Sequence, residues 1–157
     1  GGSWDISMDT EFVCVQKYKV GQTIDIDGIL DKYENEKIKL GERTDVEYVA
    51  VSSDVKYTFE SGITIDVAKV GDSELTSEPY IRSIYIDYER IKSAYKYCYK
   101  GVDNTCNKEK VKERLKGGEF WEDGSTYTYK DEENLTYANI LFDSKGYVES
   151  IEYAWWR

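Results

Sequence analysis

The sequence contains one pattern twice: Tyr57-Thr58-Phe59 followed by Tyr80-Ile81-Arg82-Ser83-Ile84, and Tyr127-Thr128-Tyr129 followed by Tyr147-Val148-Glu149-Ser150-Ile151. The pieces keep the same order and nearly the same gap in both places. The match continues upstream, because each pattern is preceded by a glycine and by two apolar residues four positions apart, the spacing of one helix face. These upstream residues are Gly21, Ile29 and Tyr33 in the first copy and Gly101, Val111 and Leu115 in the second.

The duplication predicts an α+β fold of two tandem repeats, each with a short helical segment and an antiparallel meander of about four strands. We place a lead-in at residues 1–19, the first repeat at 20–88 and the second at 89–157, within one structural unit. The predicted helices run from Thr23 or Asp25 to Tyr33 and from Asn107 to Leu115. At Glu89–Tyr99 a short connecting helix is favoured over a continued strand. The predicted strands are Val46–Val51, Val55–Phe59, Ile63–Val67, Tyr80–Tyr88, Glu119–Trp121, Thr126–Lys130, Leu135–Phe142 and Tyr147–Trp155.

Alternation along the last strand of each copy, Tyr80–Tyr88 and Tyr147–Trp155, predicts which side chains face the helices. Apolar positions recur at every second residue, which is the period of a strand with one covered face. The residues expected toward the helices are Ile84, Ile86, Tyr88, Ile151, Tyr153 and Trp155. The opposite face is expected to carry Ile81, Ser83, Tyr85, Val148, Ser150, Glu152, Ala154 and Trp156, a set that is mixed and aromatic rather than simply polar.

Composition excludes two classes of partner. The 157-residue chain carries a formal net charge of −10, and its most basic segment, Lys108–Lys116, is interrupted by glutamates. Nucleic acid is therefore not an expected partner, because binding it requires a basic face that neutralises phosphates. No apolar run reaches the roughly 18 residues that a transmembrane helix needs, so we expect no membrane span.

The three cysteines indicate a disulfide bond rather than a metal site. Cys98 and Cys106 enclose a short segment rich in turn-compatible residues, which a disulfide could close, leaving Cys14 unpaired. The alternative is three reduced thiols in a cytoplasmic protein. A metal site is not expected, because the chain has no histidine and no C-x-x-C pair.

The search for catalytic groups predicts that the protein is not an enzyme. Without histidine, the sequence lacks the commonest general base at neutral pH. The segment Asp25-Ile26-Asp27-Gly28 resembles the start of a calcium loop but lacks the later ligands of that motif, and it is better explained as an acidic helix N-terminus. No phosphate-binding glycine loop is present, and no cofactor is expected.

A resemblance to a known family rests on the closing segment Phe142-Asp143-Ser144-Lys145-Gly146-Tyr147-Val148-Glu149-Ser150-Ile151, with the glycine and short helix upstream. Over about Val20 to Trp155, in two copies, the chain resembles the tandem unit of the beta-lactamase inhibitor protein family and of related small envelope lipoproteins. The resemblance implies a concave sheet surface that grips a partner protein. The first copy departs from it, because Val70–Pro79 replaces the glycine-containing hairpin, and no binding residue of the family can be transferred.

Aromatic residues predict a binding function. Fifteen tyrosines and four tryptophans exceed ordinary usage, and both residue types dominate binding hot spots, although many tyrosines are expected in the core. We predict a non-enzymatic extracytoplasmic protein, attached to the cell envelope as a lipoprotein, whose signal segment preceded Gly1. Its aromatic sheet face would bind a protein partner through Tyr85, Tyr137, Glu152 and Trp156, with Asp66 and Glu149 favouring a basic patch. The alternative is a carbohydrate-binding module that stacks sugars on Trp155, Trp156 and Tyr85.

Overall fold

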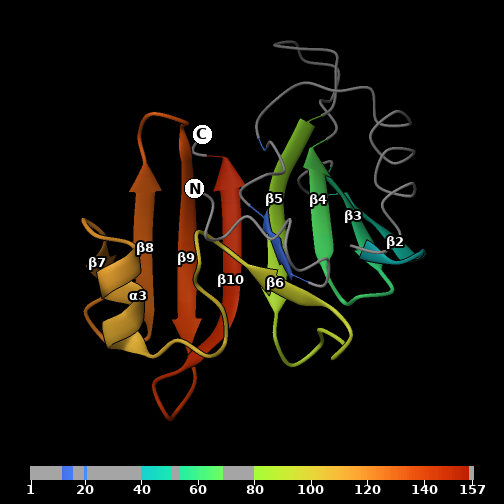
Figure 1. Cartoon of the computed structure of the whole chain (residues 1–157). Helices are drawn as coiled ribbons and strands as arrows, with labels where there is room; N and C mark the ends of the chain where they lie inside the picture. Colours follow the sequence, from blue (N-terminus) through green and yellow to red (C-terminus); the bar gives the residue numbers. More distant parts are fainter. Residues whose placement is uncertain (1–11, 16–19, 21–39, 51–53, 69–79, 156–157) are drawn as a thin grey trace.

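A single antiparallel sheet dominates the protein (Figure 1). The computed structural model describes residues 12–15, 20, 40–50, 54–68 and 80–155. Eight strands form the sheet in the order β2-β3-β4-β5-β10-β9-β8-β7. Their bounds are β2 Arg43–Val49, β3 Asp54–Phe59, β4 Thr64–Ala68, β5 Tyr80–Asp87, β7 Glu119–Phe120, β8 Thr126–Asp131, β9 Thr136–Phe142 and β10 Val148–Trp155.

These strands lie within a few residues of the eight that the sequence predicted, so the prediction of their positions is confirmed. The predicted α+β fold of two tandem repeats is wrong. The described residues form one mostly β structure with one helical element, and the two expected sheets are one sheet because β5 and β10 pair directly. The predicted helix from Thr23 or Asp25 to Tyr33 lies outside the described residues.

One face of the sheet is buried by a second layer, and we call the other the open face. The second layer contains helix α3 (Lys108–Arg114) and a parallel pair of short strands, β1 (Phe12–Cys14) and β6 (Lys96–Cys98), all on the near side in Figure 1. Alternating residues such as Ile84, Ile86 and Ile151 point into the core between the layers and are fully buried.

Two β-bulges change the predicted distribution of residues between the faces. The pairing of β4 with β5 shifts register between Asp66 and Val67. The pairing of β10 with β9 shifts register between Val148 and Ser150. A bulge adds one residue to a strand and therefore reverses the alternation beyond it. Ile81 and Val148, both predicted on the open face, are consequently buried in the core with exposed fractions of 0% and 2%.

Helix α3 forms where the sequence predicted it. Its N-cap is Asn107, whose side chain accepts a hydrogen bond from the Lys110 N–H at 2.9 Å, and its apolar residues Val111 and Leu115 are buried. At its C-terminal end, the Tyr127 hydroxyl donates to the Leu115 carbonyl at 2.5 Å and accepts from Gly118 N at 3.0 Å. Strand β8 and the helix are thereby joined by one buried side chain.

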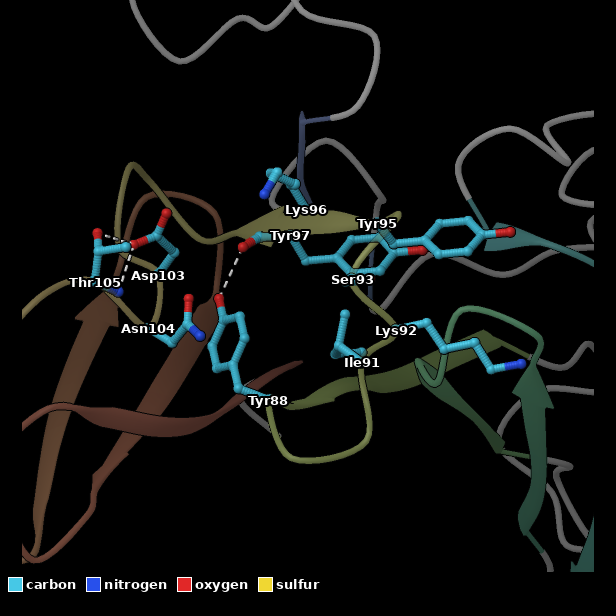
Figure 2. Close-up of a pocket in the computed structure, with 10 residues that line it drawn as sticks. All are labelled: Tyr88, Ile91, Lys92, Ser93, Tyr95, Lys96, Tyr97, Asp103, Asn104 and Thr105. Atoms are coloured by element: carbon cyan, nitrogen blue, oxygen red, sulfur yellow. Dashed lines mark hydrogen bonds between the residues drawn. The ribbon is translucent and has the colours of Figure 1, made fainter.

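The connecting helix predicted at Glu89–Tyr99 is wrong, because this segment consists of turns followed by β6. In β6, Lys96 is exposed whereas Tyr97 and Cys98 are buried, and the strand is held by its parallel pairing with β1. The Tyr88 hydroxyl donates to the Tyr97 carbonyl at 2.8 Å and so ties the end of β5 to β6 (Figure 2).

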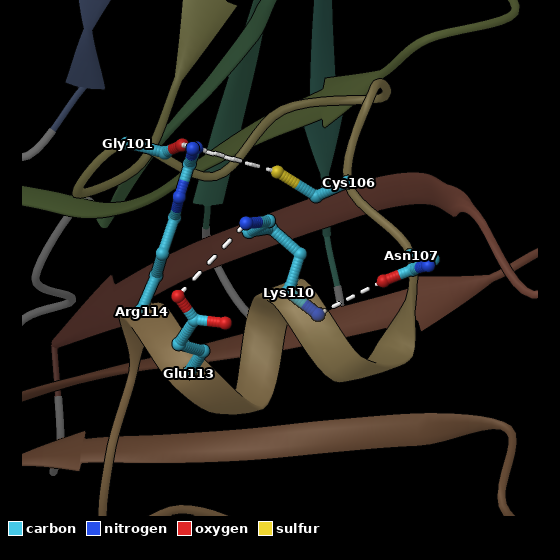
Figure 3. A network of polar contacts seen from close by, with 6 residues as sticks. All are labelled: Gly101, Cys106, Asn107, Lys110, Glu113 and Arg114. Carbon is cyan, nitrogen blue, oxygen red and sulfur yellow. Dashed lines mark hydrogen bonds and ion pairs between the residues drawn. The ribbon is translucent and has the colours of Figure 1, made fainter.

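The predicted disulfide between Cys98 and Cys106 is also wrong. Cys98 is disulfide-bonded, whereas Cys106 is a buried free thiol. Two features explain why these cysteines do not pair. The parallel register of β1 and β6 aligns Cys98 with Cys14, and Cys106 contacts an arginine of α3. The Arg114 guanidinium, at the end of α3, donates to the Gly101 carbonyl and to Cys106 Sγ at 3.5 Å (Figure 3).

Thiol titration tests this assignment. We expect the native protein, without reductant, to react slowly with a thiol reagent, because Cys106 is 2% exposed. After unfolding in denaturant without reductant, one thiol per chain should react. Three reactive thiols in protein purified from an oxidising compartment would contradict the assignment.

The burial of Ile84 and Ile151 predicts that truncating either side chain destabilises the fold. Ile84→Ala and Ile151→Ala should each lower the free energy of unfolding by roughly 2–5 kcal/mol, the usual cost of truncating a buried isoleucine. Urea unfolding followed by circular dichroism measures this loss. The control is Tyr85→Ala on the open face, which should change stability much less. Equal losses in all three variants would show that the open face is also core.

Candidate functional site

The candidate site is a row of polar and aromatic side chains that crosses the open face. The strand registers align one residue from each of five neighbouring strands: Tyr85 of β5, Glu152 of β10, Asn139 of β9, Thr128 of β8 and Glu119 of β7. At the usual spacing between strands, the row is about 19 Å long. Two of the predicted binding residues, Tyr85 and Glu152, are therefore direct neighbours at the β5 end of this row.

Hydrogen bonds link the side chains of this row. Asn139 Nδ2 donates to Glu152 Oε1 at 3.1 Å, and Thr128 Oγ1 donates to Asn139 Oδ1 at 2.6 Å. The Thr128 oxygen also accepts a 2.8 Å hydrogen bond from the indole Nε1 of Trp121. Each member fixes the orientation of the next, so the row has a defined shape before any partner binds.

The sequence analysis did not identify Trp121, nor the row residues Asn139, Thr128 and Glu119. Trp121 follows β7 at a position with the same alternation as Glu119, and 52% of it is exposed although its indole nitrogen is bonded. The preceding residue, Phe120, turns the other way and packs against Tyr127 at 4.7 Å. Alternation across Glu119–Trp121 was the available signal, because it assigns Trp121 and Phe120 to opposite faces.

Tyr137 belongs to the same region, because it precedes the row residue Asn139 by two positions in β9 and so lies on the same face. It is half-buried, and this burial raises the pKa of its hydroxyl, as does the nearby Glu152 carboxylate, while Arg82 acts in the opposite direction. Tyr85 is 38% exposed. The structure thus brings Tyr85, Tyr137 and Glu152 together, whereas the fourth predicted residue, Trp156, lies outside the described residues.

A cluster of three charged side chains, Arg82, Asp54 and Asp66, lies on the open face near β3. Arg82 Nε is 3.0 Å from Asp54 Oδ2, and Asp54 is a neighbour of Asp66. Both aspartates have a buried oxygen without a hydrogen-bond donor. Burial, together with the Asp54 charge, raises the pKa of Asp66 to about 6. The residue predicted to attract a basic partner is therefore partly protonated near neutral pH.

The ring platform of the carbohydrate alternative is not formed by Trp155. This side chain is half-buried against the core, and its ring packs edge-on against Tyr80 at a centroid distance of 4.9 Å. Within the described ranges, no cluster of three or more histidine, cysteine, aspartate or glutamate side chains could hold a metal ion. In the same ranges, no helix is long and apolar enough to span a membrane.

Comparison with known proteins identifies no family. No family model and no curated protein match the sequence, so the resemblance to the beta-lactamase inhibitor protein family stays a prediction. Among solved structures, the chain is similar to a cysteine-rich secretory protein from Staphylococcus aureus, with a TM-score of 0.40 and 13% sequence identity. The match covers 87% of this chain and 46% of that protein, so this chain spans less than half of its length.

The carboxylate pair predicts a pH-dependent gain of stability in one variant. The pKa of Asp66 is raised from an ordinary value of 3.8 to about 6, so its protonated form is favoured by the fold. Its contribution to stability is fully present below about pH 3.8 and is lost as the pH rises through about 6. Asp66→Asn should therefore be more stable than the natural protein at pH 7.5, and the gain should vanish near pH 4.

Thermal unfolding at both pH values measures this gain in stability, with exposed Asp45→Asn as the control. A gain that is equal at both pH values would contradict the assignment.

The hydrogen-bonded row predicts a local change at Trp121. Thr128→Val removes the acceptor of the indole N–H, so this proton should exchange with water faster. NMR of the ¹⁵N-labelled protein measures the exchange, with the resonance assigned by its loss in Trp121→Phe. Exchange that is unchanged in Thr128→Val would show that Thr128 does not hold the ring.

Proposed function

We propose that this protein is a non-enzymatic binding protein of the extracytoplasmic space, which uses the open face of its sheet to bind a protein partner. The single observation that carries the proposal is the row from Tyr85 through Glu152 to Trp121. Its two partly exposed rings stand on either side of a half-buried carboxylate. Tryptophan and tyrosine are enriched among the residues that carry most of the binding energy in interfaces.

Preorganisation supports this use of the face. A binding surface loses affinity when its side chains must be ordered on binding, and the cost is reduced when they are already fixed. In the free protein, Trp121 is held by Thr128, and Glu152 is held by Asn139. Tyrosine and tryptophan also present a large contact area with few rotatable bonds.

Charge supports a partner with a basic contact surface. The chain carries a formal net charge of −10, and the Glu152 carboxylate lies in the row beside Tyr85. Complementary charges accelerate association and select against acidic partners. A lysine or arginine of the partner, placed at Glu152 between Tyr85 and Tyr137, would satisfy the carboxylate oxygen that Asn139 does not contact.

The cysteine chemistry supports the proposed location. Disulfides persist in oxidising compartments and are rare in the cytoplasm, and Cys98 is disulfide-bonded. The proposal therefore places the protein at the cell surface or attached to the envelope. The proposal includes the predicted attachment to the envelope as a lipoprotein.

Site-specific crosslinking tests the proposal. With Tyr85 replaced by p-benzoylphenylalanine, irradiation of the protein in its native envelope should give one adduct of defined mass. The same replacement at Lys145, exposed in the β9–β10 turn, serves as the control and should not give that adduct. Adding Glu152→Gln or Trp121→Ala should remove it.

Calorimetry with the purified partner then gives the magnitude. Trp121→Ala and Tyr85→Ala should each weaken binding by about 2 kcal/mol, the scale of an aromatic hot spot. Their melting temperatures should change little. The proposal is wrong if position 85 gives no specific adduct, or if the adduct survives both substitutions.

A further inference from the structure

A cavity of about 360 Å³ lies on the covered side of the sheet, away from the open face. It opens between the turn that follows β5, strand β6 and the turn at 103–105 (Figure 2). Its apolar lining consists of Ile91 and three tyrosines, Tyr88, Tyr95 and Tyr97. This volume lies within the range of small-molecule sites in proteins.

The aromatic wall of the cavity is fixed by contacts within the protein. The Tyr88 hydroxyl donates to the Tyr97 carbonyl at 2.8 Å. The Tyr97 ring in turn stacks on Tyr95, with 6.3 Å between centroids and 5° between planes. Tyr88 and Tyr95 remain partly exposed while Tyr97 is buried. The rings therefore do not need to be ordered when a ligand arrives.

Most polar groups that line the larger cavity are uncharged, and its charged residues are Asp103, Lys92 and Lys96. Ser93 and Asn104 are exposed at its rim. Asp103 is held in place because its Oδ1 accepts hydrogen bonds from the Thr105 N–H at 2.9 Å and the Thr105 hydroxyl at 2.5 Å. The ammonium groups of the two lining lysines, Lys92 and Lys96, extend away from the rings (Figure 2).

A smaller cavity of about 210 Å³ adjoins the first, and Tyr88 and Asn104 line both. Its other lining residues include three acids, Glu89, Asp143 and Glu149. The linings of the two cavities together hold three tyrosines, one amide, four carboxylates and two lysines, so acidic groups outnumber basic ones. Hydroxyl groups donate readily to carboxylates, and an anionic ligand would be repelled by them.

We propose that the two adjoining cavities bind an uncharged saccharide of about two pyranose rings. One sugar would lie against the Tyr88 and Tyr95 side of the larger cavity, where C–H groups meet aromatic carbon. The second would pass Asn104 into the smaller cavity, where its hydroxyls donate to Glu89 and Glu149. A hydrocarbon ligand would leave these polar groups without partners, which is costly.

NMR titration with three disaccharides tests the proposal: maltose, cellobiose and N,N′-diacetylchitobiose. At least one should shift the amide resonances of residues 88–97 and 103–105 with saturation at millimolar concentration. Asn104→Ala, a change at an exposed turn residue, and Tyr88→Leu should each weaken this binding about tenfold, the scale of one aromatic contact. Tyr85→Ala, on the open face, is the matched control and should not alter it.

Three results would overturn the saccharide site. The first is the absence of saturable shifts with all three sugars in the folded natural protein. The second is affinity that is unchanged in Asn104→Ala. The third is a set of shifts centred on Tyr85 and Glu152 instead. None of these results would affect the proposed protein binding by the open face, which is tested by crosslinking at position 85.

Discussion

The pairing of β5 with β10 is the interaction on which the rest of this structure depends. It places Ile84 opposite Tyr153 and Ile86 opposite Ile151, and all four side chains are buried on the covered side. Without this pairing, two four-stranded meanders would each expose an unpaired strand edge and would share no core. The same register aligns Tyr85 with Glu152 on the open face. A slip of β10 by one residue would turn Glu152 toward the core and Ile151 away from it.

Local elements of this fold could be predicted from the sequence, but their assembly could not. Period-two alternation and turn residues located the eight strands. Strong helix formers followed by Gly117-Gly118 located α3. These signals act within a few residues. The direct contact between Tyr80–Asp87 and Val148–Trp155 joins segments far apart in the chain, so no local pattern specifies it. The bulges that bury Ile81 and Val148 are equally invisible, because one extra residue reverses an alternation that otherwise continues regularly.

The candidate site was predicted in part for the same reasons. Tyr85, Tyr137 and Glu152 follow from alternation in the central strands, which the bulges leave unchanged between Ser83 and Asp87 and beyond Ser150. Trp121 and its chain of hydrogen bonds depend on the order β10-β9-β8-β7 and on side-chain geometry. The cysteine pairing failed because sequence proximity favoured Cys106, whereas strand pairing aligned Cys98 with the distant Cys14.

Native-state hydrogen exchange of the backbone amides tests the central claim most directly, because it reports which strands open together. If β5 and β10 join one sheet, the amides of Ile84, Ile86, Ile151 and Tyr153 should be among the slowest to exchange. They should also show one common opening free energy, equal to that of global unfolding. Independent opening of Tyr80–Asp87 and Val148–Trp155, with faster exchange there than in β3 and β9, would show two separate sheets and would contradict the account.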